Sequence, residues 1–144
     1  MGFYKKILNV FFLFYIIGSL NIQCHYVDNV SLVQEIITIE ELFDALNSEK
    51  PTVIKFYSMH CPHCKMFEKR FEESAKKYKN ITFYSADGKK LNAPKVVAEF
   101  TEKYIKPIKI PGFPTIIYIK DGKIQNYMIG GNPKKHIENL NNLK

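Results

Sequence analysis

The chain has 144 residues, of which 46% are hydrophobic and 14% aromatic. This length suits one domain, and the composition is sufficient for a folded core, which argues against a disordered chain. The formal net charge of +7 comes from lysines scattered along the chain, without an arginine-rich or aromatic–basic stripe. The charge therefore does not indicate nucleic acid as a partner.

The N-terminal residues have the pattern of a secretory signal peptide. Lysines at positions 5 and 6 precede an apolar run over residues 7–20, which is shorter than the about 20 residues that a membrane span needs. We expect a signal peptide over residues 1–24, cleaved within 18–24, with an uncleaved signal anchor as the alternative. The mature domain then spans 25–144, without stable membrane insertion.

The first predicted element is a short strand over residues 34–38. Thr38 and Glu41 have the spacing of a capping box, which predicts a helix that continues to about Asn47. Residues 52–57 (TVIKFY) follow a proline and are rich in β-branched and aromatic residues, as is typical of a buried central strand.

A second helix is predicted from Cys61 to about Lys79, because apolar residues including Met66 recur there at helical spacing. Residues 81–86 predict another strand, and residues 92–104 predict a third helix.

The last part of the chain predicts a hairpin and a helix. Residues 115–120 and 123–129 have strand composition and are separated by an Asp-Gly pair, a strong hairpin signal. A final helix begins at Asn132 and Pro133. Helical crossovers imply parallel strands and the hairpin adds antiparallel ones. The predicted fold class is therefore α/β, with a βαβαββα core and a central mixed sheet flanked by helices on both faces.

Cys61 and Cys64 form a C-x-x-C pair at the start of the second predicted helix. Unpaired N–H groups and the partial positive charge of a helix N-terminus stabilise a thiolate more than a thiol. We therefore expect the pKa of Cys61 to lie below its ordinary value, which makes Cys61 the nucleophile of thiol–disulfide exchange. Cys64, about one turn further along, is placed to resolve the mixed disulfide.

His60 and His63 lie beside the nucleophile. A cationic or hydrogen-bonding imidazole at His63 would tune the pKa of Cys61 and make the disulfide more oxidising, whereas the alternative for both histidines is a solvated surface position. Attached haem would need a histidine where Lys65 stands, and zinc would need a second pair of ligands. A disulfide across so small a loop adds little stability, so a chemical role is favoured over a structural one.

Residues 53–65 (VIKFYSMHCPHCK) and 111–122 (PGFPTIIYIKDG) resemble the thioredoxin superfamily, in particular single domains of protein disulfide isomerases. The order of elements over residues 34–144 matches as well. The resemblance implies that a cis peptide bond precedes Pro114, and that the loop of Pro114 faces the cysteine pair and binds the substrate chain.

The resemblance also implies that Phe113, Pro62 and His60 contact substrate, although Phe113 could instead pack in the core. Two positions depart from the family pattern: His60 replaces a tryptophan, and Lys55 replaces a buried acid that relays protons to the second cysteine. Lys55 could itself relay protons, since burial lowers the pKa of a lysine. The alternatives are that Lys55 reaches solvent or pairs with an acid elsewhere in the chain.

The function implied is a thiol–disulfide oxidoreductase of the protein disulfide isomerase type. It would act as an oxidase, isomerase or reductase on protein thiols and disulfides in the secretory pathway, either in the endoplasmic reticulum lumen or outside the cell. We expect a monomer that needs no metal or organic cofactor and exchanges electrons with a donor or acceptor protein. The alternative is a thioredoxin-fold adaptor subunit of a secretory or export complex, with little or no catalytic role.

Overall fold

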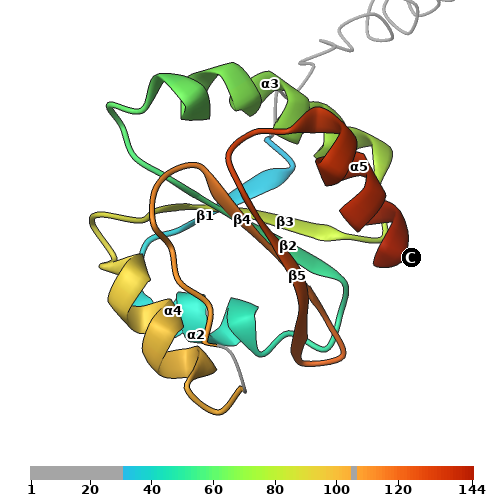
Figure 1. The fold of residues 1–144 in the computed structure, drawn as a ribbon. Helices are drawn as coiled ribbons and strands as arrows, with labels where there is room; N and C mark the ends of the chain where they lie inside the picture. The colour runs from blue at the N-terminus through green and yellow to red at the C-terminus, as the bar shows by residue number, and fades with distance from the viewer. Residues whose placement is uncertain (1–30, 105–106) are drawn as a thin grey trace, which may run out of the picture. The chain divides into compact units, whose positions relative to one another are not determined.

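Five strands and four helices make up residues 31–104 and 107–144, the part of the chain that the computed structural model describes (Figure 1). The predicted signal peptide lies outside these residues. The strands are β1 (Val33–Ile36), β2 (Thr52–Tyr57), β3 (Thr82–Asp87), β4 (Thr115–Lys120) and β5 (Lys123–Ile129). The helices are α2 (Ile39–Leu46), α3 (Pro62–Lys77), α4 (Ala93–Thr101) and α5 (Pro133–Asn142).

The strands form one mixed sheet in the order β1-β3-β2-β4-β5. β3 pairs in parallel with both β1 and β2, whereas β4 pairs antiparallel with β2 and β5. The stretch from β2 to α5 is the predicted βαβαββα core, and β1 with α2 precedes it. β2 therefore lies at the centre of the sheet, and the chain that leaves it carries the two cysteines.

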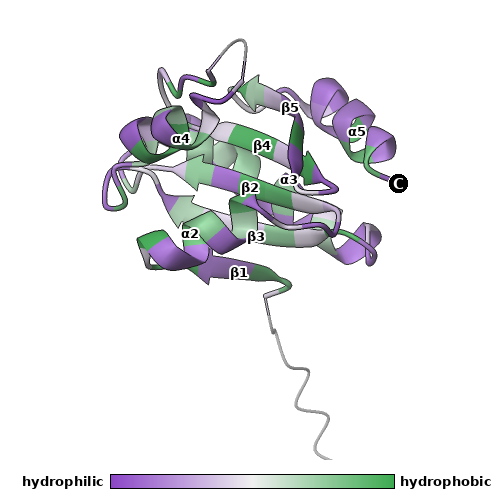
Figure 2. Cartoon of the chain, turned by 90° about the horizontal axis from the view of Figure 1, so that it is seen from below, coloured by the Kyte–Doolittle hydropathy of each residue, from purple (hydrophilic) through white to green (hydrophobic). Residues whose placement is uncertain are grey.

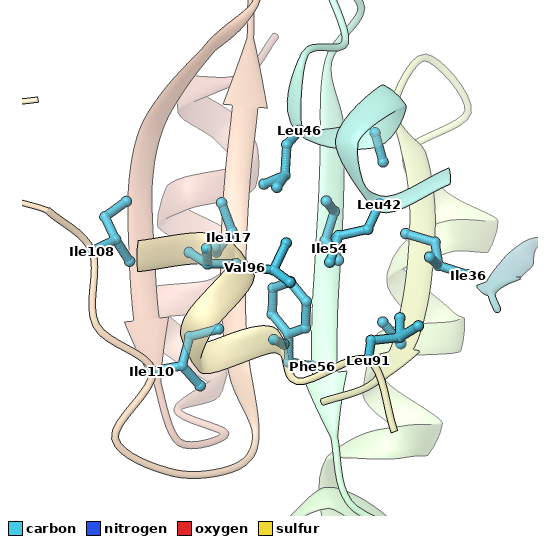
Figure 3. Close-up of a cluster of buried hydrophobic side chains, with 14 of the residues drawn as sticks. Ile36, Leu42, Leu46, Ile54, Phe56, Leu91, Val96, Ile108, Ile110 and Ile117 are labelled. Carbon is cyan, nitrogen blue, oxygen red and sulfur yellow. The ribbon is translucent and has the colours of Figure 1, made fainter. Parts of the chain in front are cut away.

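Helices cover both faces of the sheet, with α2 and α4 on one side and α3 and α5 on the other (Figure 1). β2 supplies both cores, because successive side chains of a strand point to opposite faces. Ile54 and Phe56 join the cluster beneath α2 and α4 (Figure 3), and Val53 joins the cluster beneath α3 and α5. In Figure 2, which colours the chain by hydropathy, β4 is hydrophobic and α5 is mostly hydrophilic.

The observed turns explain where elements begin and end. The Thr38 hydroxyl accepts the amide hydrogen bond of Glu41 at 3.2 Å, and the Glu41 carboxylate accepts that of Thr38 at 3.3 Å, so the predicted capping box is confirmed. Asp121 and Gly122 have φ values of 54° and 66°, as a two-residue hairpin turn with positive φ at both positions requires. β2, β4 and β5 match their predicted ranges.

Three predicted ranges were too long, including that of α3, which ends at Lys77 and not at about Lys79. The first strand ends at Ile36, because the chain must leave the sheet before Thr38 can cap α2. The third predicted helix ends at Thr101 and not at residue 104. The buried Thr101 hydroxyl donates to the carbonyl of Val97 at 2.7 Å and accepts the amide of Ile108 at 2.9 Å. These bonds fasten the end of α4 to the chain that returns towards β4.

Candidate active site

Cys61 caps the N-terminus of α3 and is joined to Cys64 by a disulfide, with the two Cα atoms 5.3 Å apart. Cys61 has extended backbone angles, and Pro62 occupies the first turn of the helix. The amide of Cys64 donates to the sulfur of Cys61 at 3.2 Å. In the reduced protein, this N–H and the positive end of the helix would stabilise a thiolate on Cys61.

The two sulfur positions differ in access. Cys64 is only 3% exposed, whereas Cys61 is half-buried and reaches the surface. A substrate sulfur can therefore reach Cys61 but not Cys64. The pair has the asymmetry that exchange needs, with an outer sulfur that meets the substrate and an inner one that completes the reaction.

The loop before β4 brings a second segment against the disulfide. The sulfur of Cys61 lies 3.3 Å from the carbonyl oxygen of Phe113, and the Phe113–Pro114 peptide bond is cis, as the resemblance implies. The carbonyl of Gly112 accepts the Thr115 hydroxyl at 2.7 Å, which ties this loop to the start of β4. Two regions about fifty residues apart in sequence thus meet at one reactive sulfur.

Several side chains close to the cysteine pair in the sequence are exposed. Met59 and Met66 are 67% and 77% exposed, and they lie in sequence on either side of the cysteine pair. His60, Pro62 and His63 are also exposed, and exposure is what contact of His60 and Pro62 with a substrate requires. Met66, one of the apolar residues at helical spacing that predicted this helix, is not part of its buried stripe. Phe67 and Phe71 form that stripe, and Met66 is turned about 100° from Phe67 around the helix.

Lys55 is fully buried beneath α3 and pairs with Glu68, with 2.5 Å between the ammonium nitrogen and a carboxylate oxygen. The ammonium also lies 4.8 Å from the centre of the Phe71 ring. Of the alternatives for Lys55, the structure shows a pair with an acid from another element. Glu68 was not predicted, although it follows Cys64 by one helical turn, a spacing that puts both side chains on the same face of α3.

A hydrogen-bonded cluster of three polar side chains, Tyr57, Glu35 and Ser85, lies beside Lys55 on the same face of the sheet. The Tyr57 hydroxyl donates to a carboxylate oxygen of Glu35 at 2.8 Å, and the Ser85 hydroxyl donates to the other oxygen. Burial and the neighbouring Glu35 raise the pKa of Tyr57 to about 12. Tyr57 therefore stays protonated at physiological pH and donates a hydrogen bond at the end of β2.

His136 of α5 is a further buried titratable group that the sequence did not single out. Its Nδ1 lies 2.7 Å from the Tyr118 hydroxyl and its Nε2 lies 3.2 Å from the Ser74 hydroxyl. Burial, with a smaller contribution from the charge of Arg70, lowers the pKa of His136 to about 4. The imidazole is therefore neutral at physiological pH and joins α5, β4 and α3.

The described residues contain no group of three histidine, cysteine, aspartate or glutamate side chains that could hold a metal ion. Within residues 31–104 and 107–144, no helix is both long enough and apolar enough to cross a membrane.

Comparison with known proteins agrees with this geometry. The Thioredoxin family profile matches residues 33–142. Thioredoxin H3 of Arabidopsis thaliana is 31% identical over 123 residues, which cover 85% of this chain and 89% of that protein. Protein disulfide-isomerase 1 of Caenorhabditis elegans is 27% identical over 85% of this chain but only 23% of its own length.

Solved structures agree on the fold. Mitochondrial thioredoxin 3 of Saccharomyces cerevisiae, in its oxidised form, superposes with a TM-score of 0.64 at 22% identity, covering 77% of this chain and 95% of that one. The chain therefore belongs to the thioredoxin family and is a thioredoxin-like thiol–disulfide oxidoreductase with the C-x-x-C pair Cys61–Cys64.

Proposed function

We propose that this chain exchanges disulfides with protein substrates in the secretory pathway, in the manner of a protein disulfide isomerase domain. The observation that carries the proposal is the asymmetric pair: a half-buried Cys61 that faces the Phe113 carbonyl, beside a Cys64 that is 3% exposed. The predicted signal peptide supports the secretory location, and the similarity to Protein disulfide-isomerase 1 supports the substrate class.

In the oxidising direction, a substrate thiolate attacks the sulfur of Cys61 and the Cys61–Cys64 bond breaks. Cys64 leaves as a thiolate and takes up a proton, and the substrate is held to Cys61 by a mixed disulfide. A second substrate thiolate then attacks the substrate sulfur of that bond. The substrate leaves with a new disulfide, and Cys61 leaves as a thiolate that the Cys64 amide and the helix N-terminus stabilise.

The reducing direction is the reverse. The Cys61 thiolate attacks a substrate disulfide, and Cys64 then displaces the substrate from the mixed disulfide. We assign His63 to tuning the pKa of Cys61, and the Phe113–Pro114 loop, Pro62 and His60 to holding the substrate chain. Lys55 keeps its proposed part in proton transfer, now as one member of a pair with Glu68.

The direction of exchange is set by the reduction potential, which equilibration with glutathione buffers measures. We expect a value near or above the poise of the endoplasmic reticulum, about −180 to −210 mV, as an oxidase or isomerase requires. A value near about −270 mV would instead indicate a reductase that needs an upstream electron donor.

Single-cysteine variants test the proposed roles of the two sulfurs. Cys64→Ser should accumulate mixed disulfides with substrate proteins, and Cys61→Ser should form none. If the Cys61→Ser/Cys64→Ser double variant kept the full cellular activity of the protein, the exchange function would be refuted and an adaptor role would replace it.

A further inference from the structure

Gly88 immediately follows β3, and hydrogen bonds to two other elements hold its backbone. Its amide donates to the carbonyl of Tyr57 at 2.8 Å, at the end of β2. Its carbonyl accepts the amide of Ala93 at 2.9 Å, at the start of α4. The Asp87 carboxylate also accepts the amides of the two residues after Gly88, at 3.0 and 3.1 Å. Gly88 is therefore a fixed point of this loop.

The aromatic ring of Phe113 occupies the space that a side chain at Gly88 would need. A Cβ atom placed on Gly88 would lie 2.2 Å from Cε1 and 2.5 Å from Cζ of that ring, and 3.3 Å from Cδ1. Non-bonded carbon atoms pack at about 3.5–4.0 Å. The φ angle of Gly88 lies outside the left-handed region, so glycine is required here for space and not for its backbone freedom.

The same residue, Phe113, connects this contact to the chemistry. Its ring is half-buried and packs against the cluster beneath α2 and α4, while its carbonyl oxygen lies 3.3 Å from the sulfur of Cys61. The Pro114 carbonyl, one residue further on, accepts the amide of Gly130 at 2.7 Å. A displaced ring must change the side-chain torsions of Phe113, the position of its backbone, or both, and that backbone carries the carbonyl beside Cys61.

We propose that Gly88 is a positioning residue of the exchange site, which acts by seating the Phe113 ring and so holding the Phe113 carbonyl beside Cys61. The inference rests on the proposed exchange with protein substrates. A polypeptide must pass the Phe113 loop to bring its sulfur to Cys61, whereas a small disulfide needs only access to the sulfur. The contact therefore matters for protein substrates much more than for small ones.

The test compares wild type with Gly88→Ala on two substrates, insulin and glutathione disulfide, under the same conditions. We expect kcat/KM for insulin reduction to fall about ten- to a hundredfold, since a misplacement of about 1 Å can cost that much. The rate with glutathione disulfide should change less than about threefold, because it does not depend on the loop. Lys89→Ala is the matched control, since it changes an exposed residue next to Gly88 without adding an atom that would meet Phe113.

A second substitution distinguishes displacement of the Phe113 ring from a general disturbance of the fold. Phe113→Leu removes Cε1 and Cζ, the two atoms that would collide with a side chain at position 88, and keeps the inner part of the side chain. The double variant Gly88→Ala/Phe113→Leu should therefore recover insulin activity relative to Gly88→Ala, giving a favourable coupling in a double-mutant cycle.

The possible results distinguish the inference from the function on which it rests. Equal insulin activity of Gly88→Ala and wild type, equal losses on both substrates, or no recovery in the double variant would overturn the role of Gly88 and leave the exchange function intact. A wild-type protein that reacts with glutathione disulfide but not with insulin would overturn the proposed function and the inference together.

Discussion

Protonation of His136 is expected to destabilise the folded domain as the pH falls. The side chain is fully buried between the Tyr118 and Ser74 hydroxyls and packs edge-on against Phe67, with 5.1 Å between the ring centres. Burial lowers the pKa of His136 from 6.5 to about 4 in the folded protein. In the unfolded chain the imidazole is solvated, so the ordinary pKa applies there.

The sign and size of the effect follow from linkage. Above pH 6.5 the imidazole is neutral in both states, and between 6.5 and about 4 only the unfolded chain takes up the proton. The free energy of unfolding therefore falls across this interval, by about 3 kcal/mol in total. Below pH 4 both states are protonated and the loss stops growing. Small domains are typically stable by about 5–15 kcal/mol, so a loss of this size is readily measured.

Urea unfolding of the oxidised domain at a series of pH values from 7 to 4 measures this loss. Other groups also titrate, so the decisive quantity is the difference between wild type and His136→Gln, which lacks the titrating ring. We expect the wild-type curve to fall by about 3 kcal/mol more than that of the variant. His60→Gln, at an exposed position, is the matched histidine control. Parallel curves for wild type and His136→Gln, or an NMR titration midpoint of His136 near 6.5, would refute the reasoning.

Four further substitutions test the packing by urea unfolding. Glu68→Ala should destabilise the protein by about 2 kcal/mol, because it leaves the buried Lys55 ammonium unpaired. Lys55→Met should destabilise it less, because the side chain of Glu68 is 47% exposed and water can solvate its carboxylate. Equal losses of stability in the two variants would contradict this reasoning. Thr38→Ala should cost about 1 kcal/mol through the lost cap of α2, and an unchanged midpoint would refute that value. Gly131→Ala should be destabilising, because its Cβ would lie 3.0–3.1 Å from Phe67; a neutral result would show that the ring can yield.

Local sequence patterns predicted the elements whose determinants are local. β2 was bounded correctly because a proline precedes a continuous β-branched and aromatic run, and the hairpin because an Asp-Gly pair separates two such runs. The position of Cys61 at a helix start followed from the helical spacing of Phe67 and Phe71 after it. Each of these signals lies within about ten residues of the feature it predicts.

The parts that could not be predicted depend on contacts between distant segments. Lys55 and Glu68 come from different elements, and nothing in either neighbourhood shows that they meet. The contact between the Phe113 ring and Gly88 joins residues 25 positions apart in the sequence. The path of the loop that brings them together is defined only by the folded sheet. His136 follows two exposed lysines on a largely polar helix, so its sequence surroundings suggest the surface, whereas the packing of α5 buries it.

The two cores of the domain differ in a way that bears on the site. The region beneath α3 and α5 holds the buried titratable side chains of Lys55 and His136, whereas the buried polar side chain of α4 is the uncharged Thr101. Apolar burial is non-directional. The partners that α3 offers to these groups, Glu68 and Ser74, are directional instead.

These two polar contacts lie six residues apart along α3, beyond the disulfide at its start. Together with the buried Phe67 and Phe71, they favour one rotation of the helix about its axis, because any other would separate the Lys55 ammonium from Glu68 and the Nε2 of His136 from Ser74. That rotation is the one that buries Cys64 and leaves Cys61 accessible. The polar groups beneath α3 thus stabilise the asymmetry of the cysteine pair without contacting the substrate. This explains why a core can retain charged and titratable side chains where apolar ones would be simpler to bury.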